Sequence, residues 1–361
     1  MSYENRYSVP EKWLHRIGFS TGAVQLNVSD IEDRLYAKQL EGIVVKQPVF
    51  ITALPRAGTT ILLNLLVKTG EFATHTYRDM PFVLCPMLWQ KFSSRFQQDD
   101  APRERAHGDG LSISLQSPEA FEEIIWRLFW KDHYRDSHIE PWTDCGDDEF
   151  LDFFTRHMRK IIALRNQGGE PGRRYASKNN GNIARLDILQ DIFPDATVII
   201  PFRDPLDHAA SLLNQHQRFL AMHSEDRFSA RYMEGIGHYD FGDNLKPVNF
   251  DDWIESDRRP DATGLGFWLE YWIAAYRYIL GRQSDTVHLL SYANLISKPH
   301  ESLARLAEVL ELRDPDALVD QAGELRPARE HSIDTSALDP KMLLHANEIN
   351  QKLQDNSIRI D

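Results

Sequence analysis

Two stretches of the chain place a short apolar run directly before a turn and a helical pattern. In residues 47–69 the apolar run leads into a turn that contains Pro55 and Gly58, and leucines then recur at helical spacing. In residues 193–205 the run consists of branched residues, and Pro205 follows it at a position suited to the first turn of a helix. Strands that alternate with helices in this way predict an α/β fold with a parallel sheet.

Helical patterns also precede and separate these two stretches. Ser29 and Glu32 form a capping-box pattern, which predicts a helix that starts there, continues to about Glu41 and ends at Gly42. Ser117 precedes apolar residues at helical spacing, so we expect an amphipathic helix to begin at that point.

These patterns predict a single domain over residues 1–361. Residues 1–45 form an N-terminal helical extension, and residues 80–175 form a helical insertion that shapes the acceptor side of the cleft. A glycine-rich linker at 167–172 returns the chain to the core, and the polar stretch 227–261 is expected to be a long loop or lid.

Composition narrows the class of protein. The 361 residues are 42% hydrophobic, enough to bury a large core, and the formal net charge of −13 disfavours nucleic acid as a partner because the average field repels polyanions. Only Cys85 and Cys145 occur, so we expect reduced thiols in a cytoplasmic protein rather than a disulfide framework. No apolar run approaches the length of a membrane span.

The turn in the first stretch has the chemistry of an anion site. The first N–H groups of a helix lack internal acceptors and lie at the positive end of its dipole, so they bind phosphate or sulfate. Gly58 allows the backbone at Ala57 to approach the anion closely. Thr59 and Thr60 add hydroxyl donors, and Arg56 adds a positive charge with forked donors.

This turn differs from the loop that binds nucleoside triphosphates. Compared with G-x-x-x-x-G-K-[ST], it keeps Gly58 and the hydroxyl of Thr60 but has Ala53 in place of the first glycine and Thr59 in place of the lysine. The comparison favours a nucleotide with fewer phosphates at this point, and a strand-to-helix turn without a ligand is the alternative.

The two stretches together resemble sulfotransferases that use 3′-phosphoadenosine 5′-phosphosulfate (PAPS). The motif P-R-x-G-T-T at 55–60, and F-P-D-A followed by R-D-P and a serine within 193–211, are similar to the two binding elements of that family. The resemblance implies that the first loop holds the 5′-phosphosulfate and that Arg203 and Ser211 hold the 3′-phosphate. It also implies a three-layer P-loop NTPase-like fold, with a short parallel β-sheet flanked by helices.

Further segments extend this resemblance to bacterial and tyrosylprotein-type members. Residues 178–186 are similar to their K-x-P-x-N-x-x-R-L stretch, although Gly181 and Asn180 depart from the usual version, and residues 291–295 are similar to the family's late strand and its exit. By resemblance, Lys178 is the second cation and neutralises the bridging oxygen as the bond to sulfur breaks. The family implies PAPS as co-substrate and no metal.

The general base is predicted less directly. Some cytosolic members use a histidine after the lysine motif, but this chain has Asn179 and Asn180 there. Tyrosylprotein-type members use a glutamate about twenty residues after the loop arginine, and the nearest carboxylate here is Asp79. We predict Asp79 as the base, with His75 and His107 as alternatives and a structural ion pair as the competing role of Asp79.

The last predictions concern the late loop and the partners. Arg326 and Arg329 are candidates for closing over the 3′-phosphate. The acceptor is expected to be a small molecule, a carbohydrate or a lipid that offers a hydroxyl or amine, and a homodimer is compatible with the sequence. Two rival functions remain at this point: a P-loop nucleotide kinase or hydrolase, and a non-catalytic nucleotide-binding protein.

Overall fold

A five-stranded parallel sheet organises the protein. The computed structural model describes residues 9–93, 103–104, 112–119, 121–143, 147–166, 172–254, 261–326 and 333–360. The strands are β1 (Val49–Ile51), β2 (Phe72–Ala73), β5 (Arg174–Lys178), β6 (Thr197–Phe202) and β7 (Val287–Ser291). Their order across the sheet is β2-β5-β1-β6-β7, and every pairing is parallel. A separate antiparallel pair joins β3 (Arg103–Glu104) to β4 (Ser112–Ile113).

Helices cover both faces of the sheet because its strands are apolar on both sides. Successive side chains of a strand point to opposite faces, and Phe50 joins one core cluster whereas Val49 and Ile51 join another. The Val49 face is covered by α4 (Thr59–Lys68), α12 (Tyr292–Ser297), α13 (Pro299–Val309) and α14 (Asp316–Val319). The Phe50 face is covered by α6 (Glu123–Phe129), α7 (Asp148–Arg165), α8 (Leu186–Ile192), α9 (Pro205–Glu225) and α11 (Leu265–Leu280). The predicted three-layer α/β fold is confirmed.

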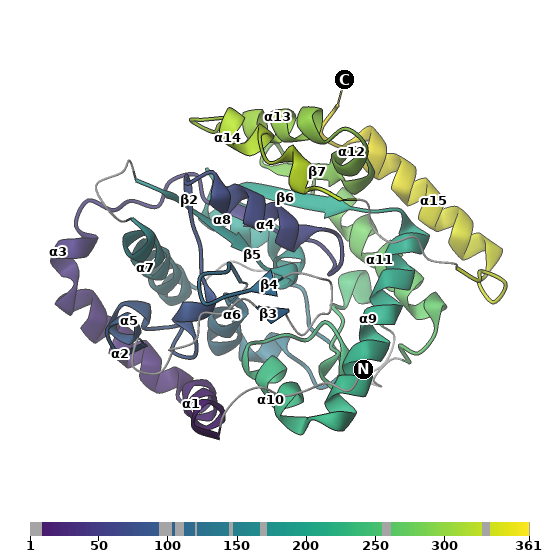
Figure 1. Ribbon diagram of the computed structural model, residues 1–361. Helices are drawn as coiled ribbons and strands as arrows, with labels where there is room; N and C mark the ends of the chain where they lie inside the picture. The colour runs from purple at the N-terminus through teal and green to yellow at the C-terminus, as the bar shows by residue number, and fades with distance from the viewer. Residues whose placement is uncertain are drawn as a thin grey trace.

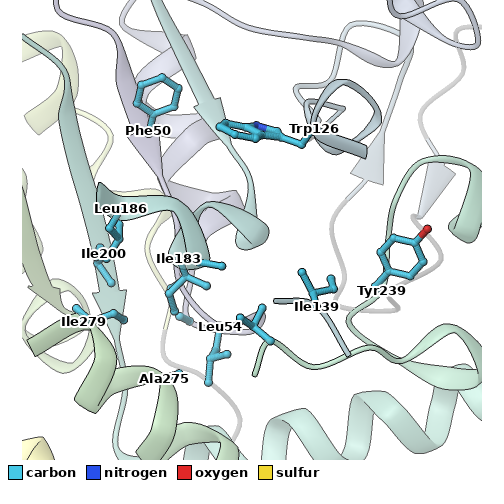
Figure 2. Close-up of a cluster of buried hydrophobic side chains, with 14 of the residues drawn as sticks. Phe50, Leu54, Trp126, Ile139, Ile183, Leu186, Ile200, Tyr239, Ala275 and Ile279 are labelled. Atoms are coloured by element: carbon cyan, nitrogen blue, oxygen red, sulfur yellow. The ribbon is translucent and has the colours of Figure 1, made fainter. Parts of the chain in front are cut away.

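The larger core lies on the Phe50 face. Figure 2 shows Phe50 and Ile200 from the sheet, Trp126 from α6, and Ile279 from α11 gathered in this cluster, and all four side chains are buried. On the outside of this layer, α15 (Pro340–Asp355) packs along α11 (Figure 1).

Two of the three N-terminal helices, the second and the third, lie beside α7 (Figure 1). The three are α1 (Val9–Ser20), α2 (Gly22–Leu35) and α3 (Ala37–Leu40). The predicted capping box is wrong, because Ser29 and Glu32 lie inside α2. Their polar atoms instead meet Lys160 of α7, whose Nζ lies 3.0 Å from the Glu32 carboxylate and 2.6 Å from the Ser29 hydroxyl. All three side chains are buried, so the pattern serves a tertiary contact rather than a helix start.

Two other expected boundaries differ from the structure. The amphipathic helix expected from Ser117 begins at Glu123, and the start of the expected lid is helix α10 (Arg227–Gly235). The remaining helices are α5 (Pro86–Ser93), η1 (Tyr77–Asp79), η2 (Lys131–His133), η3 (Asn180–Arg185), η4 (Gly242–Asn244), η5 (Phe250–Asp252) and η6 (Ala322–Glu324). The linker at 167–172 lies almost wholly outside the described residues, and the division of the chain into extension and insertion stays a prediction.

A helix that crosses a bilayer must be both long and apolar. Among the described ranges, no helix combines the length and the apolar character that crossing a bilayer requires.

Candidate functional site

Four strands end at one edge of the sheet, and the predicted donor residues lie there. The 56–60 loop follows β1, Lys178 ends β5, Arg203 directly follows β6, and Tyr292 directly follows β7. Ligands of open parallel sheets bind outside the carboxyl ends of the strands, so this edge is the expected place for a nucleotide.

The first loop has the backbone of an anion cradle. Arg56 and Gly58 adopt the left-handed conformation, with φ of 70° and 101°, and Gly58 caps α4. A side chain at Gly58 would meet the Tyr292 ring, because a Cβ there would lie 2.9 Å from Tyr292 Cδ2. Ala57 and Thr59 are buried, whereas Thr60 is half-buried in the first turn of the helix. Only glycine fits this position without displacing Tyr292.

The structure joins the second element to this loop. Arg203 Nη1 donates to the carbonyl oxygen of Arg56 at 3.2 Å, and Arg56 Nε donates to the hydroxyl of Ser211 at 3.4 Å. The guanidinium of Arg203 also lies over the Tyr292 ring, 5.2 Å from its centroid. Two arginines from loops about 150 positions apart therefore share one site, as one doubly phosphorylated ligand requires.

A neutral histidine holds the loop that carries Arg56. His208 is fully buried on α9, and its Nε2 lies 2.7 Å from the carbonyl oxygen of Pro55, to which it donates. Burial, followed by the positive charges of Arg203 and Arg56, lowers the pKa of His208 to about 3. The imidazole is therefore uncharged at neutral pH and holds the loop without adding to the positive charge of the site.

Asn180 connects the first loop to a distant segment. Its Oδ1 lies 3.5 Å from the hydroxyl of Thr59, and its Nδ2 donates to the carboxylate of Asp240 at 2.9 Å. Asn179, rather than Asn180, caps η3 by accepting from the N–H of Gly181 at 3.0 Å. Asn180 is therefore free to join β5 to the loop and to Asp240.

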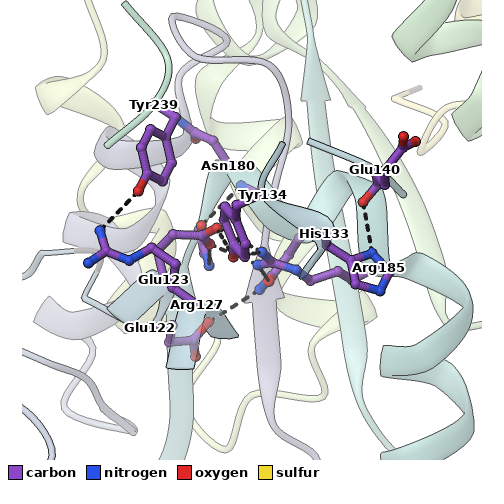
Figure 3. Close-up of polar contacts among 12 residues, drawn as sticks. Glu122, Glu123, Arg127, His133, Tyr134, Glu140, Asn180, Arg185 and Tyr239 are labelled. Atoms are coloured by element: carbon purple, nitrogen blue, oxygen red, sulfur yellow. Dashed lines mark hydrogen bonds and ion pairs between the residues drawn. The ribbon is translucent and has the colours of Figure 1, made fainter. Parts of the chain in front are cut away.

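A buried ion pair supports the segment that carries Asn180. Glu123 accepts from both terminal nitrogens of Arg185, at 2.7 and 2.8 Å, and from Asn179 at 2.9 Å (Figure 3). The Arg185 guanidinium is in turn enclosed by the rings of Trp126 and Trp142, with centroids at 4.4 and 4.1 Å. These contacts anchor η3 at a defined position beside the donor loop.

Asp79 lies in a separate buried network. Its carboxylate accepts from Arg165 at 2.5 Å and from the N–H of Thr76 at 2.8 Å, and it lies 3.5 Å from Nδ1 of His75. The charge of Arg165 and the contact with His75 outweigh burial and hold the pKa of Asp79 far below its usual range. None of these three partners belongs to the donor loop, an arrangement that favours the structural ion pair named as the competing role of Asp79.

The remaining predicted residues are spread over the chain. His75 is buried and stacks on His157, with the two Nε2 atoms 3.1 Å apart. Lys178 is half-buried at the end of β5, and Arg326 is exposed just after η6. His107 and Arg329 lie outside the described residues.

Sequence analysis did not identify the roles of Tyr292, His208 and Asp240. A signal existed for Tyr292, because it directly follows the late strand in a segment that resembles the family. No local signal could have found Asp240, which meets Asn180 from 60 positions away.

Known proteins are similar to this chain at two levels, solved structures and a family model. A search of curated proteins found no match. Among solved structures, the chain is similar to sulfotransferase STF9 from Mycobacterium avium, with 14% identity, a TM-score of 0.48, and coverage of 94% of this chain and 85% of that one. It is also similar to sulfotransferase STF1 from Mycobacterium tuberculosis H37Rv, with 18% identity, a TM-score of 0.44, and coverage of 91% and 81%.

A family model gives the stronger evidence. The model described as "Sulfotransferase family" matches residues 48–316, which include the 56–60 loop, Lys178, Arg203, Ser211 and the end of β7. The match covers well over half of the 361 residues. The chain belongs to the sulfotransferase family.

Proposed function

We propose that this protein transfers a sulfonyl group from PAPS to a hydroxyl or amine of an acceptor. The observation that supports this proposal most strongly is the junction of the two arginine-bearing loops, where Arg203 donates to the Arg56 carbonyl and Arg56 donates to Ser211. A nucleotide with phosphate groups at both its 3′ and 5′ positions needs two such cationic groups in one site.

The residues of the cradle fit this donor by their chemistry. The left-handed loop and the first turn of α4 present backbone N–H groups, together with the Thr59 and Thr60 hydroxyls, to the 5′-phosphosulfate. Arg56 supplies a forked positive charge at the same end. Arg203 and Ser211 would hold the 3′-phosphate.

Transfer requires positioning and compensation of charge. The acceptor atom must attack sulfur in line with the leaving phosphate oxygen, and negative charge grows on that oxygen as its bond to sulfur breaks. Lys178, at the end of β5, is placed on the same edge of the sheet as the loop and would neutralise this charge. For the group that removes the proton, the sequence predicts Asp79, with His75 and His107 as alternatives.

Calorimetry separates this proposal from a kinase or hydrolase. Adenosine 3′,5′-bisphosphate, the spent donor, should bind more tightly than ATP with Mg²⁺, because the loop lacks the lysine that holds a triphosphate. Tighter binding of ATP with Mg²⁺ would refute the donor assignment.

Turnover separates an enzyme from a nucleotide sensor. PAPS should be consumed in the presence of a panel of phenols, alcohols, sugars and lipids, with the product identified by its mass increase. A protein that binds adenosine 3′,5′-bisphosphate but modifies nothing in the panel would be assigned to the sensor class.

We further propose a small-molecule, carbohydrate or lipid acceptor, and a cytoplasmic location in keeping with only two cysteines.

A further inference from the structure

A short turn after α10 presents two titratable side chains beside the donor site. Gly237 has a φ of 78°, and a Cβ at this position would lie 2.6 Å from Cγ of Glu123, so the turn packs directly against α6. The N–H of His238 donates to the carbonyl of Met233 at 2.8 Å. The turn therefore has a defined conformation, and it projects His238 and Asp240 from one end of a packed helix.

The imidazole of His238 is held in place by stacking. Its ring lies parallel to the Phe219 ring of α9, with centroids 5.3 Å apart and an angle of 11° between the planes. The side chain keeps 15% of its surface exposed, and that of Asp240 keeps 25%. Both side chains are held by their surroundings and keep part of their surface exposed.

Contacts connect this pair to the donor loop. His238 Nε2 lies 3.6 Å from the Asp240 carboxylate, the same carboxylate accepts from Asn180 at 2.9 Å, and Asn180 lies 3.5 Å from the Thr59 hydroxyl. The positive charge of Lys178 also lowers the pKa of His238. This chain of contacts connects His238 to the donor loop.

The groups around His238 determine its charge. Burial comes first and lowers the pKa of His238; Asp240 and Glu119 raise it, and Lys178 lowers it. His223 is a further titratable neighbour, with its own pKa lowered by burial. The net result is a neutral imidazole near pH 7, the form that can accept a proton.

We propose that His238 is the proton acceptor of the transfer reaction and that Asp240 is the positioning residue that stabilises its protonated form. The inference rests on the proposed function. The acceptor oxygen forms a bond to sulfur while the bond from sulfur to the 5′-phosphate oxygen breaks, and that electron pair leaves on adenosine 3′,5′-bisphosphate. The acceptor's proton moves to Nε2 of His238 beside the Asp240 carboxylate, and the imidazolium later returns it to water.

The test compares variants that keep the packing. His238→Phe retains the ring that stacks on Phe219 but removes both nitrogens, and His238→Asn provides a second, smaller replacement. His345→Phe on the exposed side of α15 is the matched control. Release of adenosine 3′,5′-bisphosphate from PAPS is measured with 4-nitrophenol, tyramine and water as acceptors, and the affinity for adenosine 3′,5′-bisphosphate is measured by calorimetry.

Both His238 variants should lower kcat roughly 100-fold while nucleotide affinity stays within about twofold, since a positioned base contributes on the order of 10² or more. Wild-type kcat/KM should rise with pH through a pKa below 6.5, and this rise should disappear in His238→Phe. In Asp240→Asn the rise should move to lower pH, because the carboxylate that favours the imidazolium is gone. A merely structural role would not shift that profile.

The outcomes distinguish the two proposals. Wild-type turnover that survives in folded His238→Phe and His238→Asn overturns the role of His238 and leaves the proposed function standing. A wild-type protein that fails to bind adenosine 3′,5′-bisphosphate overturns the proposed donor site itself. One that binds it but releases none from PAPS with any of these acceptors, water included, overturns catalysis and His238 together.

Discussion

Replacing Arg203 by alanine tests the centre of the proposed donor site. The side chain lies between the Arg56 carbonyl and the Tyr292 ring, so its removal deletes one charge and its forked donors without opening a buried apolar cavity. A charge-assisted hydrogen bond contributes about 1.5–3 kcal/mol, and Arg203 is expected to make its bonds to the 3′-phosphate. We therefore expect Arg203→Ala to weaken binding of adenosine 3′,5′-bisphosphate by about 2–3 kcal/mol, roughly 30- to 140-fold.

Omission of the 3′-phosphate makes the assay specific. Calorimetry on the wild type should show that adenosine 5′-monophosphate binds more weakly than the bisphosphate by a similar factor. In Arg203→Ala the two nucleotides should bind almost equally, because the group that recognises the difference is gone. Arg282→Ala is the matched control, since that guanidinium also lies over a tyrosine ring, Tyr278, and pairs with Asp187 instead.

An internal reporter shows whether the substitution acted locally. The charge of Arg203 is the second cause, after burial, of the low pKa of His208, so its loss should raise that pKa in a histidine NMR titration. Circular dichroism confirms folding. A folded Arg203→Ala protein that still prefers the bisphosphate as the wild type does would refute the assignment of Arg203 to the 3′-phosphate.

Gly58, Asp79, Lys160 and His208 allow further tests. Gly58→Ala should weaken nucleotide binding at least tenfold, because a φ of 101° disfavours a side chain and Tyr292 occupies the space. Gly266→Ala is the control and should not weaken binding, since its Cβ would lie 3.8 Å from Leu338. Equal nucleotide affinities of the two variants would contradict the close-approach argument. Asp79→Asn should lower the free energy of unfolding by about 3 kcal/mol, because it breaks the buried ion pair with Arg165. It should leave kcat within twofold of the wild-type value. A 100-fold fall in kcat at unchanged nucleotide affinity would restore Asp79 as the base. Lys160→Met should cost about 3 kcal/mol or more in urea unfolding because it strands Glu32 and Asp33, and the double variant with Glu32→Gln should recover part of that loss. The pKa of histidine is near 6.5 in the unfolded chain, and that of His208 is about 3 in the folded protein. Between these values the unfolded state binds more protons, so the free energy of unfolding falls as the pH falls. From pH 7 to pH 5 His208 should lower the free energy of unfolding by about 2 kcal/mol, and His208→Gln should remove this pH dependence.

Sequence analysis predicted the parts of the site that are built from neighbouring residues. The 56–60 loop and Arg203 each follow a short apolar run at its carboxyl end, so strand, turn and helix signals placed both at one edge of a parallel sheet. The resemblance to a family paired them. Each of the two motifs lies within a window of about twenty positions.

Long-range contacts explain what the sequence did not reveal. Ser29 and Glu32 match the capping-box pattern perfectly, yet their partner is Lys160, about 130 positions away, and no local pattern contains that information. Asp79 was weighed as a base or as an ion pair, and its partner, Arg165, lies 86 positions further along. The polarity of residues 227–261 predicted a loop or lid, but burial of Tyr232 and Met233 against the core makes the start of this stretch helix α10.

The position of Tyr292 has a consequence for how the protein matures during synthesis. The Tyr292 ring borders Gly58 and lies under the Arg203 guanidinium, and Tyr292 directly follows β7. Strand β7 joins the sheet by pairing with β6 along its whole length. A nascent chain that has emerged only as far as α11 already contains the loop at 56–60 but lacks its far wall. Ribosome-bound fragments that end before residue 287 should therefore be unable to retain the nucleotide, and this ability should appear only once β7 has been added.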